Sequence, residues 1–309
     1  MITVVFSTYN GADTLSATLQ SMQDLDDPDG GWKLIAVDNA STDKTADILK
    51  SFSSKLPMQT LYQPRRGKNA CLNMAIPYFE GDLVIFTDDD VIPMQNWLVA
   101  YIKLAEQHPE ISVFGGSIIP HWPGKVPESL LVSIPLGPAF AVHPEDLQEG
   151  PVSPHMIWGP NMAIRKQIFD DGYQFNENIG PNIGNYIMGS ETELLLRLND
   201  AGYLNWYTKD IIVKHQILKH QFSPRWIFGR AVRFGKKRCA AAMQERQDQT
   251  NVVRVFGLPR CQVWRLIKDI SLIPIKLMKK DQADFLEIIW RIGLNSVSIR
   301  NEIKLKWKI

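Results

Sequence analysis

Short apolar runs alternate with helix-period segments through the first 118 residues of the chain. The runs are rich in β-branched residues and cover residues 2–7, 33–38, 58–62, 83–87 and 112–118. The helix-period segments between them cover residues 14–22, 44–52, 71–78 and 97–108. Strands that are apolar throughout are typical of a parallel sheet covered by helices on both faces. The alternation therefore predicts an α/β fold with a mostly parallel, doubly wound sheet.

The rest of the chain contains a proline-rich stretch, a second set of short elements and a helical tail. Residues 120–154 hold eight prolines and little helical period, which predicts a long ordered loop or insertion. Strands are expected at 156–164, 204–207 and 211–214, a helix at 191–201, and mainly helix from residue 223 onward. We therefore predict an α/β domain over residues 1–222, with halves 1–118 and 119–222, and a basic helical region over residues 223–309.

Composition and charge limit the kinds of protein that this chain can be. With 309 residues and 45% apolar content, the chain can bury a large core, and its three cysteines lack the paired spacing of a zinc site. No run of about 18 apolar residues predicts a membrane span, and the start lacks a basic leader, so we expect a cytoplasmic protein. Residues 1–213 carry 13 basic and 26 acidic residues, whereas residues 214–309 carry 21 basic and 7 acidic ones. The basic part indicates either an anionic partner or a solvated helix face.

Three consecutive aspartates, Asp88, Asp89 and Asp90, directly follow one of the predicted strands. Packed carboxylates repel one another and raise each other's pKa unless a cation compensates. The triplet therefore indicates a divalent metal site, with a solvated acidic turn as the alternative.

Polar clusters follow three of the predicted strands, at residues 7–10, 38–43 and 87–90. The carboxyl ends of parallel strands meet at one edge of the sheet, where ligands of α/β proteins bind. We therefore expect the three clusters to converge on one site. Ser41, Thr42 and Asp43 also suit the start of the next helix, so some of these residues serve as caps only.

These clusters carry a family resemblance. Residues 4–10, 37–45 and 86–90 resemble, in order and spacing, the family 2 nucleotide-sugar glycosyltransferases of GT-A fold. Residues 66–73, 159–165, 189–194 and 213–215 extend the resemblance to roughly residues 1–240. The acidic helix start departs from the family pattern, because Glu191 stands where an Asp is usual and Ser190 where a Glu is usual.

The resemblance implies an inverting transferase that moves a sugar from a UDP- or dTDP-type donor to an acceptor hydroxyl, in polysaccharide or glycoconjugate synthesis. The donor would bind to residues 1–118, and a saccharide or lipid-linked saccharide acceptor to residues 119–222. Asp90 and His215 would hold Mg²⁺ or Mn²⁺, with a surface or core histidine as the alternative for His215. Asp88 and Asp89 are assigned to the donor, although Asp89 is expected to face the other way because adjacent residues on an extended chain alternate.

Other residues of the clusters are assigned to the donor as well. Thr8 and Asn10 are candidate pocket-wall residues, with a plain loop role as the alternative. Asp38 is predicted to accept the imide N–H of a uracil or thymine ring, or else to join the helix-capping network. Arg66 and Lys68 are candidate phosphate contacts, and solvated loop cations are the alternative.

The acceptor side depends on one carboxylate. An acceptor hydroxyl needs a base as it attacks, and Glu191 at a helix start is our candidate. Glu193 would project about 200° away on the helix, so a salt bridge, a dipole complement or an acceptor contact suits it better. Trp158 and Asn161 are candidate acceptor-side residues, with a core role as the alternative for Trp158.

Three rival functions explain less of the chain. A nucleotidyltransferase would need a glycine-rich, cationic phosphate loop after the first strand, where residues 7–11 supply one glycine and no cation. A catalytically inactive glycan- or nucleotide-binding protein is disfavoured by Asp90, Glu191 and His215, and a nucleic-acid binder leaves the acidic edge unexplained. The tail alternates apolar residues at helical spacing with lysines, which fits either packing on the first domain or weak association with an anionic membrane surface.

Overall fold

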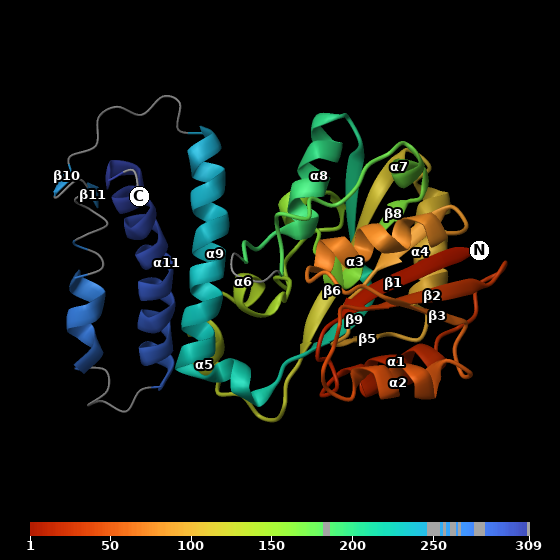
Figure 1. Ribbon diagram of the computed structural model, residues 1–309, viewed down its shortest axis with the longest axis horizontal. Helices are drawn as coiled ribbons and strands as arrows, with labels where there is room; N and C mark the ends of the chain where they lie inside the picture. The colour runs from red at the N-terminus through yellow and green to blue at the C-terminus, as the bar shows by residue number, and fades with distance from the viewer. Residues whose placement is uncertain are drawn as a thin grey trace. The chain divides into compact units, whose positions relative to one another are not determined.

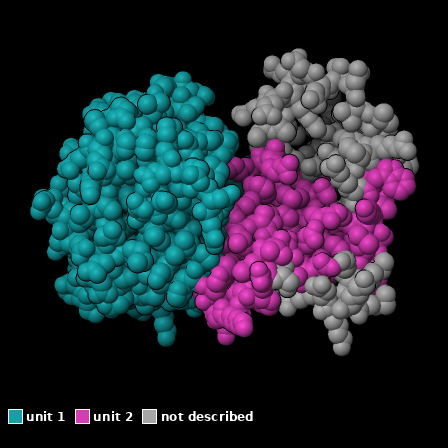
Figure 2. Space-filling view, turned by 180° about the vertical axis from the view of Figure 1, so that it is seen from behind, with its two compact units in different colours: residues 1–121, 141–217 teal, residues 122–140, 218–309 magenta. Residues whose placement is uncertain are grey.

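The computed structural model describes residues 1–181, 186–245, 254–255, 258–259, 264, 267–274 and 282–307 (Figure 1). The chain divides into two compact units, coloured separately in Figure 2. Unit 1 comprises residues 1–121 and 141–217, and unit 2 comprises residues 122–140 and 218–309.

Unit 1 is built around a nine-stranded sheet. Its strands are β1 (Ile2–Thr8), β2 (Trp32–Asp38), β3 (Met58–Tyr62), β4 (Leu83–Phe86), β5 (Val91–Pro93), β6 (Ile111–His121), β7 (Gly150–Pro151), β8 (Met162–Arg165) and β9 (Leu204–Gln216). Its helices are α1 (Leu15–Gln23), α2 (Thr45–Phe52), α3 (Lys68–Ala75), α4 (Trp97–Gln107), α7 (Gln167–Asp170) and α8 (Ser190–Asp200). Three 3₁₀ helices join them: η1 (Ile76–Tyr78), η2 (Pro154–Met156) and η3 (Gly159–Asn161).

The strand order is β3-β2-β1-β4-β8-β6-β9-β5, and β7 pairs with β9. The first four strands of this order are parallel, and β6 and β9 are parallel as well. Strand β8 runs antiparallel between β4 and β6 and joins the two parallel groups into one sheet. The expected α/β architecture is therefore confirmed.

Alternate residues of the strands feed two separate cores, one on each face of the sheet. Val4 and Phe6 of β1 belong to a core with residues of α1, α2 and α4. Val5 belongs to the core on the other face, with residues of α3, α7 and α8. Since helices cover both faces, every side chain of β4 is buried, which explains why the strand sequences are apolar throughout.

Two expected elements differ from those observed. The strand expected at 156–164 begins only at Met162, because η2 and η3 occupy the residues before it. The two short strands expected at 204–207 and 211–214 are a single long strand, β9. The pairing of β6 with β9 shifts its register at the gap between the two expected strands, because Gly116 pairs with Thr208 and the next residue, Ser117, pairs with Ile212.

Unit 2 is mainly helical, as expected for the region from residue 223 onward. Its described elements are α5 (Glu128–Ser133), α6 (Leu136–Phe140), η4 (Lys219–Phe222), α9 (Pro224–Glu245), the strand pair β10 (Arg254–Val255) and β11 (Leu258–Pro259), and α11 (Gln282–Trp307). Residues 267–274 are also helical. A Cβ at Gly293 of α11 would lie 2.7 Å from the Ala231 Cβ of α9, so the two helices pack closely at that glycine.

Part of the tail that we expected to be amphipathic lies outside the described residues, namely Leu266, Lys276, Lys279, Lys280 and Lys308. Among the described helices, none combines the length and the hydropathy needed to cross a membrane.

Candidate active site

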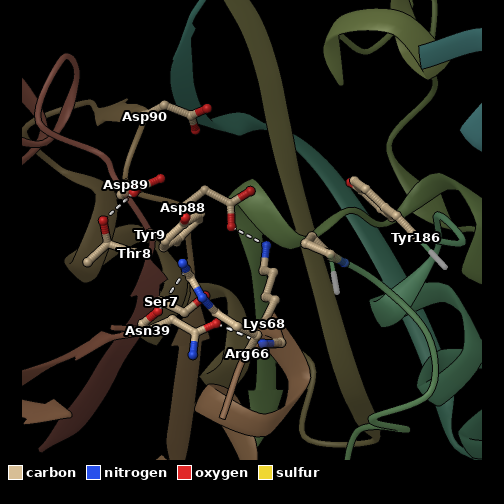
Figure 3. Close-up of a pocket in the computed structure, with 12 residues that line it drawn as sticks. Ser7, Thr8, Tyr9, Asn39, Arg66, Lys68, Asp88, Asp89, Asp90 and Tyr186 are labelled. Carbon is tan, nitrogen blue, oxygen red and sulfur yellow. Dashed lines mark hydrogen bonds and ion pairs between the residues drawn. The ribbon is translucent and has the colours of Figure 1, made fainter. Parts of the chain in front are cut away.

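A cavity of about 520 Å³ opens beyond the carboxyl ends of β1, β2 and β4 (Figure 3). Its lining residues are Ser7, Thr8, Tyr9, Asn39, Arg66, Gly67, Lys68, Asp88, Asp89, Asp90, Pro181 and Tyr186. The three polar clusters thus meet at this edge of the sheet, as the order of strands and helices predicts.

The three aspartates of the triplet have three different partners, and Figure 3 shows those of Asp88 and Asp89. The Asp88 carboxylate forms an ion pair with the Lys68 ammonium at the start of α3. The Asp89 carboxylate accepts a hydrogen bond from the Thr8 hydroxyl, and a Cβ at Gly11 would come within 2.3 Å of the same carboxylate. Gly11 therefore leaves the space in which Asp89 reaches β1.

Asp90 lies against His215, and strand pairing brings them together. Val91 of β5 is the register partner of His215 in β9, and the backbone N–H of Gln216 donates to the Asp90 carbonyl at 2.8 Å. The two side chains meet with 3.1 Å between His215 Nε2 and Asp90 Oδ2. The short strand β5, which we did not predict from the sequence, therefore positions the pair.

The surroundings move the pKa values of these groups apart. Burial and the neighbouring Asp90 charge raise the pKa of Asp89 to about 7. Burial also raises the pKa of Asp90, but the charge and hydrogen bond of His215 together with the charge of Lys68 hold that pKa below its ordinary value. For Lys68, burial lowers the pKa, but Asp88 and Glu191 outweigh it and keep the ammonium charged.

The residues around Asp90 suit a hard divalent cation. Asp90 Oδ1 is buried and has no hydrogen-bond partner among the described residues, so one oxygen beside His215 remains available to a ligand. No group of three or more His, Cys, Asp or Glu side chains in the described part of the chain is arranged to hold a metal ion. Asp90 and His215 would therefore need further ligands from a bound diphosphate or water, as is usual for Mg²⁺.

Glu191 stands in the first turn of α8, after Gly189, whose φ of +103° favours glycine. The backbone N–H of Gly159 in η3 donates to Glu191 Oε1 at 3.3 Å. A Cβ at Gly159 would lie 3.5 Å from Lys68 Nζ and 3.7 Å from Glu191 Oε1. The carboxylate of Glu191 and the Lys68–Asp88 pair are thus brought to the same small region.

Glu193 takes the salt-bridge role that we weighed for it. Its Oε1 lies 2.9 Å from Arg197 Nε, one turn further along α8, and Arg197 also donates to the Gln174 carbonyl at 2.6 Å. This geometry links the helix to the segment before it.

The polar residues after β1 and β2 bind mainly to one another. Asp38 Oδ1 accepts the backbone N–H of Ser41 at 3.0 Å, which is the capping alternative that we left open. Asn10 lies outside the cavity lining, and its Oδ1 accepts the backbone N–H of Thr42 at 2.8 Å. These contacts hold the two loops together.

Asn39 is a pocket residue that sequence reasoning did not single out. Its Nδ2 donates to the carbonyls of Gln63 and Arg65, both at 2.9 Å, and its Oδ1 accepts the Gly67 N–H at 2.8 Å. Asn39 therefore fixes the loop that leads into α3. Its place in the polar cluster next to Asp38 was the available signal.

Arg66 stacks on Tyr9, with its guanidinium carbon 3.3 Å from the ring centre, and donates to the Asn39 carbonyl at 3.1 Å. Tyr9, Pro181 and Tyr186 line the cavity but were not among our candidates. Tyr9 belongs to the cluster after β1, whereas Pro181 and Tyr186 lie in a stretch without periodicity, so only tertiary structure brings them here.

The structure corrects our acceptor-side expectation for Asn161. Asn161 is fully buried, its Oδ1 accepts from Trp97 Nε1 and the Tyr101 hydroxyl, and its Nδ2 donates to the carbonyls of Ser117 and Ile211. Both donors and both acceptor positions of the amide are used, so Asn161 joins α4, β6 and β9 instead of facing a substrate.

Trp158 is half-buried beside Gly159. Its ring stacks on His143, with ring centres 4.2 Å apart, and its Nε1 donates to the His155 carbonyl at 2.7 Å. Trp158 thus combines a packing role with a position next to the residue that contacts Glu191.

Comparison with known proteins agrees with this geometry. The chain is 24% identical over 279 residues to glycosyltransferase AglE of Haloferax volcanii, covering 86% of this chain and 80% of that protein. Its structure resembles that of mannosyltransferase PcManGT from Pyrobaculum calidifontis in complex with GDP-Man and Mn²⁺, with a TM-score of 0.58, 18% identity, and coverage of 97% of this chain and 74% of that one.

It also resembles S. aureus TarS 1–349 in complex with UDP, with a TM-score of 0.51, 16% identity, and coverage of 100% of this chain and 92% of that one. These two likenesses confirm the GT-A type of the fold. The family model described as "Glycosyl transferase family 2" matches residues 3–172, which is more than half of the chain. The chain therefore belongs to glycosyl transferase family 2.

Proposed function

We propose that this glycosyltransferase moves a sugar from a UDP- or dTDP-type donor to an acceptor hydroxyl in a single, inverting displacement. The observation that carries the proposal is the cavity beyond β1, β2 and β4. The aspartate triplet and Lys68 line this cavity. His215 and Glu191 stand outside its lining, but His215 contacts Asp90, and Glu191 accepts the Gly159 N–H next to Lys68.

The donor half of the site would hold the nucleotide diphosphate. Asp90 and His215 would hold Mg²⁺ or Mn²⁺, with Asp88 and Asp89 beside them. When bound, the cation offsets the negative charge that grows on the departing diphosphate. Arg66 lines the same cavity and contributes a second positive charge toward the phosphates.

The nucleobase would lie near the strand ends of β1 and β2. Asp38 is our candidate for the imide N–H of a uracil or thymine ring, since its second carboxylate oxygen remains to accept a bond while Oδ1 binds the Ser41 N–H. Thr8 is proposed to act on the donor site through Asp89, because its hydroxyl donates a hydrogen bond to that carboxylate.

Glu191 is our candidate base. Its carboxylate would take the proton of the acceptor hydroxyl as that oxygen attacks the anomeric carbon. The Gly159 N–H holds one carboxylate oxygen in place, and a Cβ at Gly159 would lie close to both that carboxylate and Lys68 Nζ. A direct attack needs no protein nucleophile and inverts the anomeric configuration.

The acceptor is proposed to be a saccharide or lipid-linked saccharide in polysaccharide or glycoconjugate synthesis. Trp158 and Glu193 are the remaining acceptor-side candidates. The basic unit 2 is proposed to associate weakly with an anionic membrane surface, on the cytoplasmic side, where a lipid-linked acceptor would be present.

The first test compares donors. Thermal unfolding is measured with UDP-, dTDP- and GDP-sugars, with and without Mn²⁺, because a ligand of the native state raises its melting temperature. We expect a metal-dependent rise with UDP- or dTDP-sugars, together with slow donor hydrolysis. A rise with GDP-sugars alone would overturn the assignment of the donor.

The second test concerns the base. Glu191→Gln should retain the donor-induced rise and lose transfer by at least about 100-fold, since general-base catalysis contributes about that much. Glu110→Gln, at an exposed site outside the cavity, is the matched control and should keep full transfer. Full transfer in Glu191→Gln would remove that residue from the role of base.

A further inference from the structure

Helix α3 contacts the chain segment that precedes the helix of the proposed base. This segment, residues 175–180, lies between α7 and α8 and has no regular secondary structure. Two asparagines of α3, Asn69 and Asn73, point their side-chain amides at its backbone. Asn69 is buried, with 1% of its surface exposed.

The side-chain amides of Asn69 and Asn73 form several hydrogen bonds with the backbone of this short segment. Asn69 Nδ2 donates to the carbonyl of Asn176 at 2.7 Å and to that of Ile179 at 3.0 Å. Asn73 Nδ2 donates to the carbonyl of Phe175 at 2.9 Å, and Asn73 Oδ1 accepts the Phe175 N–H at 2.9 Å. A side chain that bonds to both backbone groups of one residue replaces a strand partner, so the segment is fixed in position without a sheet.

Glu177 adds a further attachment. Asn73 Nδ2 also donates to Glu177 Oε1 at 3.1 Å, and Arg65 Nη2 lies 2.6 Å from Glu177 Oε2. Arg65 is the residue before Arg66 of the donor cavity. The segment is therefore tied to the same loop and helix that bear the proposed phosphate contacts.

The far end of the segment is tied to the start of α8. The backbone N–H of Gly180 donates to the Ile187 carbonyl at 2.8 Å in an antiparallel bridge. A Cβ at Gly180 would meet the Ser190 Oγ at 2.1 Å, so the segment packs directly on the residue before Glu191. Residues 175–180 therefore contact both the residue at 187 that leads into α8 and the first turn of α8 itself.

Lys68 of α3 contacts both the end of this segment and the aspartate triplet. Its backbone N–H donates to the Pro181 carbonyl at 3.2 Å, while its side chain is paired with Asp88. Helix α3 thus contacts the aspartate triplet through Lys68 and the approach to Glu191 through Asn69 and Asn73.

We propose that Asn69 and Asn73 are positioning residues for Glu191. They hold residues 175–180, and through the Gly180–Ile187 bridge the first turn of α8, so that the Glu191 carboxylate stays aligned with the donor cavity. This inference rests on the proposed role of Glu191. It adds that the donor-side helix α3 sets the place of the base.

The test separates donor binding from turnover. Asn73→Ala removes the contacts to Phe175 and Glu177, and neither Asn73 nor its partners line the donor cavity. We expect kcat for transfer to fall by about 10- to 100-fold, because a misplacement near 1 Å costs about that much. The donor KM and the rise in melting temperature with UDP and Mn²⁺ should change by less than about twofold, since the donor contacts are unchanged and KM reports donor binding when transfer is slower than donor dissociation.

A purely structural role would give another pattern. Asn205→Ala is the matched control, because Asn205 is also a buried amide and its Nδ2 lies 3.4 Å from Asn199 Oδ1, away from the segment. It should lower the melting temperature and leave kcat unchanged. If Asn73→Ala behaves like this control, the positioning role is wrong.

A conservative variant covers the case in which Asn73→Ala does not fold. Asn73→Asp keeps the shape and the acceptor for the Phe175 N–H but loses both donated bonds, and it faces Glu177 with a like charge. It should fold and show the same selective loss of kcat, and an unchanged kcat would overturn the proposal. The proposed function is tested apart from this, because it fails if the wild-type chain transfers no sugar or if Glu191→Gln retains transfer.

Discussion

At the scale of single residues, neighbours in the sequence take different roles because their surroundings differ. Asp88 forms an ion pair with the half-buried Lys68, Asp89 accepts a hydrogen bond from the Thr8 hydroxyl, and Asp90 faces His215. Three identical side chains therefore have pKa values that move in two directions. The carboxylate with a lowered pKa, Asp90, is also the one with a buried oxygen that lacks a hydrogen-bond partner among the described residues.

His143 lies outside the proposed machinery and supports a prediction about pH. Its Nδ1 accepts the Ile118 N–H at 3.1 Å and its Nε2 donates to the Met156 carbonyl at 2.9 Å, so the ring is neutral with the proton on Nε2. Burial lowers its pKa from 6.5 to about 4. Below pH 6.5 the unfolded chain binds a proton that the folded chain does not, so this contribution to stability is complete above pH 6.5 and is lost as the pH falls toward 4.

We therefore expect that the free energy of unfolding falls by up to about 3 kcal/mol through this histidine as the pH falls, at about 1.4 kcal/mol for each pKa unit. Urea unfolding of wild type and His143→Gln across this range measures the difference. The variant should be less stable near neutral pH and should lose less stability on acidification. Parallel curves for the two proteins would contradict the assignment of a neutral His143.

At the scale of elements, strand register places functional side chains that are far apart in the sequence. The pairing of β5 with β9 places His215 beside Asp90, and the pairing of β6 with β9 shifts its register between Gly116 and Ser117. Gly116 at this register shift has no room for a side chain. A Cβ there would lie 2.3 Å from Asn161 Nδ2 and 2.4 Å from the Ile211 carbonyl oxygen.

Gly116→Ala should therefore lower the free energy of unfolding by about 3 kcal/mol, the upper end of the usual cost of overpacking a core. The backbone of β9 cannot yield as a flexible side chain would, and the Asn161 bonds to β6 and β9 would be strained. Equilibrium urea unfolding measures the loss. Gly229→Ala in the interior of α9 is the control, because replacing a helical glycine by alanine is neutral or stabilising.

The helices and strands also show how much secondary structure the local sequence pattern predicts. Periodicity and composition predicted both ends of β3 correctly. They also predicted each end of α1, α2 and α4 to within one residue. They did not predict β5, which has only three residues, or the single strand β9, whose central polar residues interrupt the apolar pattern. In both cases the partner strand, and not the local sequence, determines the conformation.

At the scale of the whole molecule, the two ends of the chain carry opposite charge. The 26 acidic residues before residue 214 include the triplet, and the 21 basic residues after residue 213 fall mostly in unit 2. Within unit 2, Trp264, Ile267 and Ile270 are 60%, 51% and 50% exposed, next to the exposed Lys268. Apolar side chains beside basic ones are typical of a surface that lies on an anionic membrane.

We expect the protein to sediment with vesicles that contain anionic lipid at low salt, and to be released as salt rises and screens the charges. Trp264→Ala combined with Ile267→Ala should weaken binding at low salt, since each removes apolar area from the interface. Vesicles of neutral lipid are the control and should bind little protein. If anionic vesicles at low salt recruit no protein, unit 2 does not associate with membranes.

The sequence alone determined the α/β class, most helices and strands of the first 118 residues, the edge of the sheet where the polar clusters meet, and the family, because these depend on local periodicity and on polar residues that directly follow strands. Only the tertiary structure decided that Asn161 lies in the core, that Asn39 fixes the pocket loop and that α3 holds the approach to Glu191. These contacts join residues from 28 to 110 positions apart. Such pairings depend on strand register and helix packing across the whole sheet, which no local pattern encodes.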